Sequence, residues 1–288
     1  MNCWSSFAAV LLTSAAALLS ADAAPTPGTL SPINAAAARD PNAVDVELVL
    51  AVDISYSMDI DELALQREGY AQALQSSEFL QALKSGPTGR IAITYFEWAA
   101  SSDQKVVVPW QVIDGPESAD AVAAVILNTP IRRASRTSIS GAISFAVPLL
   151  QDNSYHGLRR VIDISGDGPN NNGAPVTSAR DAALQLGIVI NGLPIMVKEP
   201  SYSTMDINDL DIYYEDCVIG GPGSFAIAIK HRDKFKDAIR SKLVMEVAGL
   251  NPERLAPERL VQPVAETRRE PRVSCLVGEK IWDDRWGK

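Results

Sequence analysis

Hydrophobic residues along the chain form short continuous runs that alternate with segments of helical periodicity. Residues 45–52 (DVELVLAV) are continuously apolar in their second half, which is typical of a strand buried on both faces. Residues 59–83 have apolar positions at helical spacing, with an interruption near Ser76 and Ser77 that predicts a broken or bent helix. Further strands are predicted over 90–98, 105–110, 160–165, 188–197 and 224–229, and further helices over 118–127, 138–150, 176–186 and 233–247.

This alternation of strands and helices predicts an α/β fold with a doubly wound, mostly parallel sheet and helices on both faces. Parallel neighbours need crossover connections, and the predicted helices supply them. The strands over 90–98 and 105–110 are close enough in sequence to form a hairpin, so one edge strand is expected to be antiparallel.

The N-terminal region is typical of an exported protein. An apolar run over 7–19 is followed by the sequence ADA at 21–23, which places small residues at positions −3 and −1 of a cleavage site. No later segment reaches about 18 apolar residues, so no transmembrane segment is expected. The protein is then periplasmic or secreted, and the alternative is an N-terminus that is not cleaved. We expect a signal peptide over 1–23, a flexible leader over 24–43, one domain over 44–248 and a C-terminal extension over 249–288 that packs on the domain surface.

Composition and charge exclude several classes of partner. The chain has 288 residues and a formal net charge of −9, with a pI of about 4.8. Such a surface repels nucleic acid and anionic lipid, so neither is expected as a partner. The two histidines, His156 and His231, leave few places for a histidine base. Once a signal peptide containing Cys3 is removed, Cys217 and Cys275 fit one disulfide in an oxidising compartment; the alternative is two buried thiols.

Three polar clusters lie where predicted strands end or helices begin. Asp53, Ser55 and Ser57 directly follow the first buried strand. Thr137 precedes a predicted helix, and Asp167 follows a predicted strand. The carboxyl ends of parallel strands share one edge of the sheet, where ligands collect. Because all five side chains offer only oxygen, we predict that they hold one Mg²⁺ ion, or alternatively Mn²⁺ or Ca²⁺, and leave a coordination position open.

Each of these residues also has a purely structural explanation. Asp53, Ser55 or Ser57 could cap the helix that follows. Thr137 could cap its own helix, and Asp167 could belong to a plain turn. For a single residue the structural explanation is the stronger one, but the joint placement of all five favours a metal site. Two carboxylates at one edge would also repel each other without a cation.

The three segments that carry these residues resemble the metal-site loops of von Willebrand factor A domains. They are residues 49–58 (VLAVDISYSM), 136–143 (RTSISGAI) and 161–168 (VIDISGDG), and the resemblance extends over 44–247. Gly166 departs from the pattern, because the family usually has threonine there. The layout of the chain is also similar to exported bacterial proteins that contain this domain, whereas the segment after 247 lies outside the pattern.

The resemblance implies how such a site works. It implies that Ser55, Ser57 and Thr137 bind the ion directly. Asp53 and Asp167 then act partly through water, and a carboxylate of a partner completes the coordination shell. We therefore expect a binding module, and not an enzyme, whose partner is a protein or envelope component that presents a carboxylate. The alternatives are a metal-dependent or serine hydrolase, for which the chain lacks the Gly-x-Ser-x-Gly and His-Glu-x-x-His motifs, and a structural scaffold with a non-functional ion.

Three further segments have weaker interpretations. Glu97 and Trp98 end a predicted strand, and they either line the metal-bearing edge or are ordinary strand-end residues. Residues 170–173 (NNNG) are interpreted as a solvated connection. The acidic residues within 206–215 are interpreted as a solvated loop, with a second cation site as the alternative.

Overall fold

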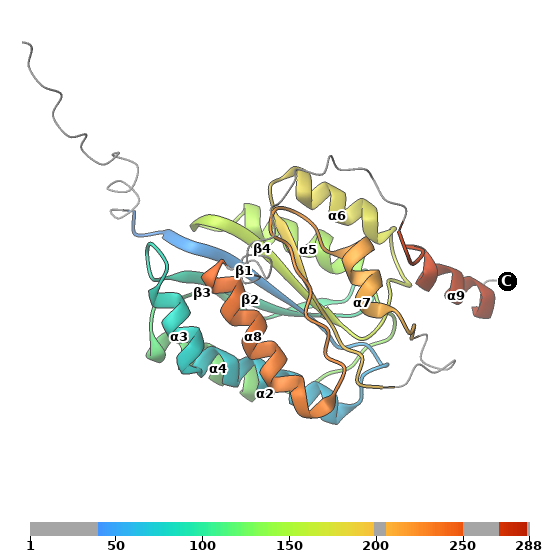
Figure 1. Ribbon diagram of the computed structural model, residues 1–288, viewed down its shortest axis with the longest axis horizontal. Helices are drawn as coiled ribbons and strands as arrows, with labels where there is room; N and C mark the ends of the chain where they lie inside the picture. Colours follow the sequence, from blue (N-terminus) through green and yellow to red (C-terminus); the bar gives the residue numbers. More distant parts are fainter. Residues whose placement is uncertain (1–39, 199–205, 250–270, 287–288) are drawn as a thin grey trace, which may run out of the picture.

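The computed structural model describes residues 40–198, 206–249 and 271–286, and its centre is a five-stranded sheet (Figure 1). The predicted signal peptide and most of the predicted leader lie outside the described residues. The strands follow the order β3-β2-β1-β4-β5 across the sheet. Their bounds are β1 (Ala43–Asp53), β2 (Ile91–Trp98), β3 (Gln104–Ile113), β4 (His156–Gly166) and β5 (Val189–Pro194).

The sheet confirms the predicted mixed topology. Strand β1 pairs in parallel with β2 and β4, β4 pairs in parallel with β5, and only β3 runs antiparallel, at the edge beside β2. Every residue of β1 is buried, as its continuously apolar sequence predicts for a strand covered on both faces. The central position of β1 places its carboxyl end beside those of two neighbours.

Helices cover the two faces of the sheet and enclose two apolar clusters (Figure 1). Leu48 and Leu50 of β1 face α2, α3, α4 and α8, whereas Val49 and Ala51 face α5 and α6. This period of two is the one that a pleated strand imposes. The bounds are α2 (Ile60–Gln75), α3 (Ser77–Lys84), α4 (Pro116–Asn128), α5 (Ile139–Gln151), α6 (Val176–Gln185), α7 (Leu210–Tyr213), α8 (Phe235–Ala248) and α9 (Val277–Trp286), with a π-helix η1 (Tyr214–Val218) and a 3₁₀ turn η2 (Arg232–Lys234).

The predicted break in the first helix is confirmed at Ser76. This residue is extended, with φ −70° and ψ 147°, and it separates α2 from α3. Its backbone N–H donates to Ala73 O at 3.2 Å, and its hydroxyl accepts from Phe79 N at 3.2 Å. One serine therefore ends α2 and caps the start of α3.

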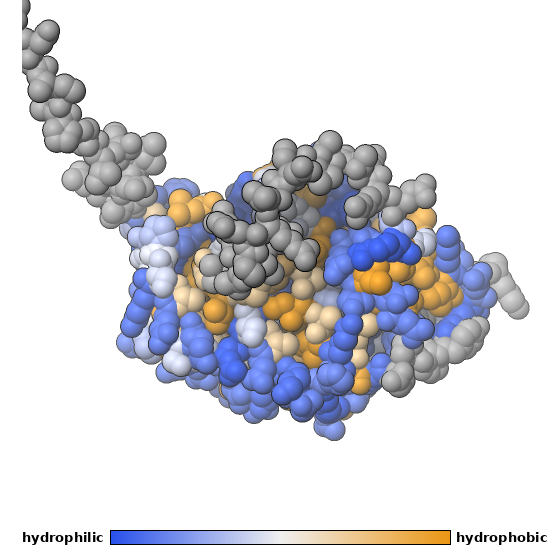
Figure 2. Space-filling view, viewed as in Figure 1, coloured by the Kyte–Doolittle hydropathy of each residue, from blue (hydrophilic) through white to orange (hydrophobic). Residues whose placement is uncertain are grey.

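The outer faces of the helices are polar. In Figure 2, the helices along the lower edge of the molecule present mostly hydrophilic residues to solvent. None of the helices in the described part of the chain is long and apolar enough to cross a membrane.

Two expectations about local structure are wrong, and one helix is present that was not expected. The segment over 224–229 is not a strand, because it pairs with β5 and the residue after it only through isolated bridges at Ala226 and Ile229. The acidic segment over 206–215 is not a solvated loop, because it contains α7 and the start of η1, with Leu210 and Tyr213 buried. The C-terminal extension contains a helix, α9, that the sequence analysis does not predict.

Candidate metal centre

The two predicted carboxylate ligands lie side by side at one edge of the sheet. Asp53 is the last residue of β1, and Asp167 directly follows β4. The two strands are parallel neighbours, with Val52 opposite Ser165. Asp53 is fully buried, and Asp167 is partly exposed. Their position agrees with the rule that ligands collect at the carboxyl ends of parallel strands.

The position of Gly166 has little room for a side chain, because the Asp53 carboxylate and the Tyr214 hydroxyl lie close to it. A Cβ at this position would lie 2.9 Å from the Tyr214 hydroxyl and 3.0 Å from Asp53 Oδ2. A side chain there would therefore push Asp53 or Tyr214 aside. The departure from threonine at this position accompanies a tight packing of the Asp53 carboxylate against the backbone of β4.

Two side-chain hydrogen bonds and one close contact between hydroxyl oxygens join four of the five predicted ligands. The Ser55 hydroxyl donates to Asp53 Oδ2 at 2.9 Å, and the Ser55 backbone N–H donates to Asp53 Oδ1 at 2.7 Å. The two serine hydroxyls, of Ser55 and Ser57, lie 2.9 Å apart. The Ser57 hydroxyl then donates to Asp167 Oδ1 at 2.6 Å. The hydroxyls of Ser55 and Ser57 thus lie between the two carboxylates in space.

Thr137, the fifth predicted ligand, is held between the other two loops through its backbone. Its N–H donates to Asn171 Oδ1 at 2.9 Å, and its carbonyl accepts from Asn171 N at 2.8 Å, which attaches it to the loop after Asp167. Earlier in the same segment, Ala134 N donates to Ile54 O at 3.1 Å, in the loop after β1. The buried Thr137 therefore belongs to a segment that contacts both carboxylate-bearing loops.

The predicted ligands do not cap the helices that follow them, because two other residues do so. Helix α2 is capped by Asp59, whose carboxylate accepts from Glu62 N at 2.7 Å, while Glu62 Oε2 accepts from Asp59 N at 2.9 Å. Helix α5 is capped by Ser138, whose hydroxyl accepts from Gly141 N at 3.1 Å. The side chains of the predicted ligands are therefore not the N-caps of the helices that follow them.

The electrostatics of the two carboxylates are unfavourable in the protein alone. Burial raises the pKa of Asp53 to about 7, although hydrogen bonds from Ser55 oppose the shift. Burial and the neighbouring charge of Asp53 raise the pKa of Asp167 well above its usual range. Both shifts have the sign expected of carboxylates that are removed from water and placed close together without a neutralising cation.

The donor set fits a hard divalent cation. Two carboxylates and two or three hydroxyls are the oxygen ligands that Mg²⁺ and Mn²⁺ prefer, and their number leaves room for water or an external ligand. No cluster of three or more His, Cys, Asp or Glu side chains that could hold a metal occurs in the described residues. The candidate centre differs from such a cluster, because three of its five predicted ligands are hydroxyls.

The asparagines after Asp167 are not a solvated connection. Asn170 is fully buried and Asn171 is 8% exposed. Asn170 Oδ1 accepts from Ser140 N at 3.0 Å, and Asn172 Oδ1 accepts from Ser101 N at 2.9 Å. Asn170 and Asn171 thus attach the loop after β4 to the segment around Thr137, 30 and 34 residues away in sequence, and Asn172 attaches it to the loop after β2. This supporting role was missed because local sequence does not show which distant backbone groups an amide will meet.

Glu97 and Trp98 are strand-end residues with structural roles. Glu97 is buried and pairs with Arg67 of α2 at 2.5 Å, and Arg132 lies 3.7 Å from its second oxygen. Trp98 is fully buried in the cluster beneath α5, and its carbonyl accepts from Ile54 N at 3.0 Å. Trp98 also lies opposite Asp53 in the sheet, at the edge that carries the candidate metal centre. The burial and ion pairs of Glu97 favour the strand-end interpretation.

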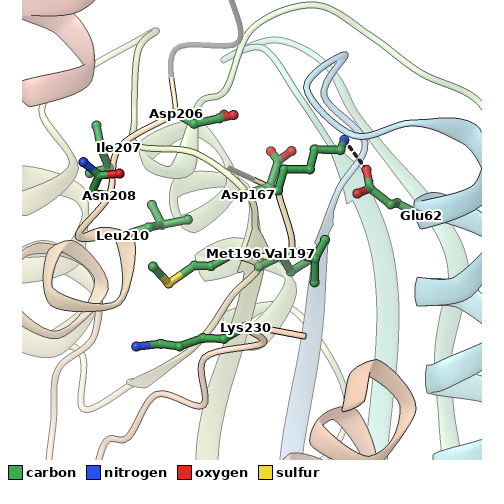
Figure 3. Close-up of a pocket in the computed structure, with 11 residues that line it drawn as sticks. Glu62, Asp167, Met196, Val197, Asp206, Ile207, Asn208, Leu210 and Lys230 are labelled. Carbon is green, nitrogen blue, oxygen red and sulfur yellow. Dashed lines mark ion pairs between the residues drawn. The ribbon is translucent and has the colours of Figure 1, made fainter. Parts of the chain in front are cut away.

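Asp167 also borders a cavity of about 200 Å³ (Figure 3). Lys198 extends across this region: its ammonium pairs with Glu62 and donates to Ser57 O at 2.7 Å. Figure 3 shows the side chain of Asp167 between those of Asp206 and Glu62. The remaining lining residues come from the end of β5 and the segment before α7, and they are Ile195, Met196, Val197, Ile207, Asn208, Leu210 and Lys230.

The sheet order and the joined Asp-x-Ser-x-Ser and Asp loops define a von Willebrand factor A-type domain, which confirms the resemblance seen in the sequence. More specifically, the chain belongs to the family described as "Protein of unknown function (DUF1194)", whose model matches residues 43–251. No curated protein matches the chain by sequence.

Solved structures show the same fold at low sequence identity. Proximal thread matrix protein 1 from the mussel byssus, in a structure with a zinc-occupied MIDAS motif, has a TM-score of 0.51 at 10% identity over 72% of this chain and 48% of that one. The pilus adhesin SpaC from Lactobacillus rhamnosus GG has a TM-score of 0.53 at 11% identity over 72% and 31%. The chain thus spans about half of the mussel protein and about a third of the adhesin.

Proposed function

We propose that this protein is an exported, metal-dependent binding module that captures a carboxylate of a protein or cell-envelope partner. The observation that carries the proposal is the continuous row of oxygen atoms from Asp53 through Ser55 and Ser57 to Asp167, each within 2.9 Å of the next residue in the row, at the carboxyl ends of two parallel strands. A divalent ion at this point would replace the unfavourable proximity of the buried Asp53 carboxylate and the partly exposed Asp167 carboxylate by attraction.

The partner's chemistry follows from the donor set. Asp53 and Asp167 would supply negative charge, and Ser55, Ser57 and Thr137 would supply neutral oxygens. A Mg²⁺ or Mn²⁺ ion coordinated in this way retains exchangeable positions, and an external carboxylate is a strong oxygen ligand for such a position. The net charge of −9 would otherwise repel an acidic partner, so recognition would depend on the ion.

Similar solved structures support the binding role, and the N-terminal sequence and the disulfide support export. The similar structures include one described as a pilus adhesin and one with a zinc-occupied MIDAS motif. The predicted signal peptide, together with the disulfide between Cys217 and Cys275, favours a periplasmic or secreted location.

Binding without catalysis is part of the proposal. His156 begins β4, at the end opposite Asp167, and a strand of this length separates the two by about 35 Å. Its Nδ1 lies 2.6 Å from Asp40 Oδ2, on an exposed surface. This histidine is therefore too far away to act as a base for a nucleophile at the candidate metal centre.

The first test is calorimetric titration of the exported protein with Mg²⁺ and Mn²⁺. We expect saturable binding of one ion per chain. Asp53→Asn and Asp167→Asn should each weaken the affinity by at least about a hundredfold, since the loss of supporting groups alone costs about 10- to 100-fold. The matched control is Asp61→Asn, which removes one exposed carboxylate from the first turn of α2 and should leave the affinity unchanged.

The second step tests partner chemistry. Acidic peptides and their amidated, uncharged counterparts would be titrated into the metal-loaded protein, with and without a chelator. Binding of the acidic peptide that disappears with the chelator supports the proposal. If the native protein binds neither ion, or if the control variant loses binding as fully as Asp53→Asn, the proposed metal site is wrong.

A further inference from the structure

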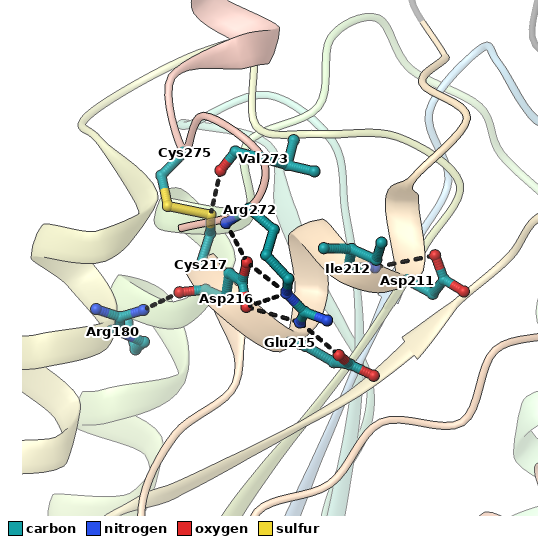
Figure 4. A network of polar contacts seen from close by, with 9 residues as sticks. All are labelled: Arg180, Asp211, Ile212, Glu215, Asp216, Cys217, Arg272, Val273 and Cys275. Carbon is teal, nitrogen blue, oxygen red and sulfur yellow. Dashed lines mark hydrogen bonds and ion pairs between the residues drawn. A yellow bond between two sulfur atoms is a disulfide. The ribbon is translucent and has the colours of Figure 1, made fainter. Parts of the chain in front are cut away.

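The C-terminal helix α9 lies outside the family match, which ends at residue 251, yet it is firmly attached to the domain. A disulfide joins Cys275 to the fully buried Cys217 of η1 (Figure 4). Beside it, Arg272 pairs with Glu215 at 2.6 Å and with Asp216 at 2.8 Å, and Arg272 N donates to Asp216 Oδ2 at 2.7 Å. These contacts fix the point at which α9 begins.

From this anchor, α9 reaches two of the three loops of the candidate metal centre. Glu279 Oε1 accepts from Asn170 Nδ2 at 2.7 Å, three residues after Asp167. The ring of Trp282 lies beneath the guanidinium of Arg136 at 3.7 Å, next to Thr137. Glu279 and Trp282 are three positions apart, so they share one face of the helix.

Arg136 has an unusual backbone conformation that makes the Trp282 contact significant. Its φ is +74°, and it is the only non-glycine with a positive φ in the described residues. A left-handed conformation costs an arginine free energy and persists only when neighbouring groups hold it. The conformation of Arg136 sets the direction in which the chain enters Thr137. The cation–π contact with Trp282 therefore stabilises the backbone that presents a predicted ligand.

Asn170 gives α9 a second connection to the site. This fully buried amide donates to Glu279 Oε1 and Ala174 O, and it accepts from Ser140 N. The packing is tight, because a Cβ on Gly278 would lie 2.1 Å from the carbonyl oxygen of Asn170. Loss of Glu279 would leave one N–H of a buried amide unsatisfied and would loosen the loop that follows Asp167.

We propose that α9 is part of the metal centre, with Trp282 and Glu279 acting as positioning residues for Thr137 and Asp167. The inference rests on the proposed metal-binding function. The disulfide and the Arg272 ion pairs hold α9 in place, while Trp282 and Glu279 orient the two loops. Neither residue touches the predicted ligands, so their effect is expected on the affinity for the ion through the loops.

The test compares Mn²⁺ affinity in the full exported protein and in four variants. Trp282→Leu and Glu279→Ala should each weaken binding about tenfold, the size typical of groups that orient metal ligands. Trp282→Phe should restore most of the affinity, because its ring can again face Arg136. Asp284→Ala is the control for Glu279→Ala, since it removes the same charge from an exposed position of α9 and should not change the affinity.

Hydrogen exchange on the metal-free proteins provides a second measurement. Trp282→Leu should speed exchange at residues 136–141 and Glu279→Ala at 168–173, whereas exchange in β1 should not change. If the native protein binds Mn²⁺ and both variants bind it equally well, this inference is wrong and the proposed function stands. If the native protein binds no ion, the proposed function fails and this inference fails with it.

Discussion

Two groups of carboxylates, one beside Asp163 of β4 and one beside Asp167 after it, differ in the origin of the charge that balances them. Asp163, in the strand, faces α8, where Lys242 Nζ lies 2.9 Å from Asp163 Oδ1 and 2.6 Å from Glu246 Oε1. Asp167 follows the strand and faces Asp53. Among the described residues, no basic side chain forms an ion pair with either Asp53 or Asp167.

The difference separates a group with a structural role from a group that is a candidate for metal binding. Lys242 is fully buried and supplies a permanent cation, and Asn191 Nδ2 donates to Glu246 Oε2 at 2.7 Å, so the acids beside α8 have partners within the chain. Burial still raises the pKa of Asp163 to about 6, with Lys242 opposing the shift. The pair at the strand ends has hydroxyl partners and no ion pair among the described residues. The charge of Lys198, which pairs with Glu62, only partly opposes the raised pKa of Asp167, and an added ion would relieve the remaining repulsion. A carboxylate pair that the chain itself does not neutralise is therefore the better candidate for ligand binding.

The largest expected effect follows from removing the internal cation. Lys242→Met leaves Asp163 and Glu246 buried without an opposite charge and should lower the free energy of unfolding by about 3–5 kcal/mol. Urea denaturation measures this loss. Lys236→Met is the control on the same helix: its pair with Glu68 is solvent-exposed, so it should cost less than about 1 kcal/mol. Equal stability of the native and Lys242→Met proteins would show that the two carboxylate groups do not differ as argued.

A smaller effect is expected from adding the external cation. At a free Mg²⁺ concentration of a hundred times Kd, the native protein should gain about 2.7 kcal/mol in its free energy of unfolding. The gain should disappear with a chelator and in Asp53→Asn, because the ion would then lose its ligands. It should persist in Asp163→Asn, whose altered carboxyl belongs to the other group. A gain of the same size in Asp53→Asn would place the bound ion elsewhere.

The sequence is most informative where a residue's role depends on its own segment. The uninterrupted apolar run before Asp53 predicts the central strand, and the interruption near Ser76 predicts the break between α2 and α3. Counting cysteines predicts the disulfide between Cys217 and Cys275, which is confirmed. The convergence of Asp53 with Asp167 also follows from local patterns, because parallel strands necessarily end at the same edge.

Features that depend on distant partners are not visible in the sequence. The extended segment over 224–229 has strand-like residues, but only its spatial relation to β5 determines that it forms isolated bridges. Asn170 and Asn171 belong to a polar run that is typical of a solvated loop, and their burial results from backbone groups more than 25 residues away.

The sequence of helix α9 contains a short pattern that is typical of a helix. Val277 and Ile281 are four positions apart, which is the spacing of one helix face. The Pro- and Arg-rich sequence before the helix is typical of an irregular segment, and two apolar positions are a weak signal beside it. Its contact with Arg136 depends on the fold of the whole domain and was not predictable from either segment alone.

The smallest expected effect distinguishes a helix cap from a metal ligand within one loop. Asp59 and Ser55 are four residues apart, but only Asp59 caps α2, with its carboxylate 2.7 Å from Glu62 N. Asp59→Ala should lower the free energy of unfolding by about 1 kcal/mol and leave the Mn²⁺ affinity unchanged. Ser55→Ala should weaken Mn²⁺ binding at least about tenfold, since the candidate site loses a hydroxyl that also orients Asp53. Urea denaturation and calorimetric titration of both variants would measure the two effects separately. If Asp59→Ala weakened Mn²⁺ binding as much as Ser55→Ala, the loop would act as one unit, and the assignment of separate capping and ligand roles would be wrong.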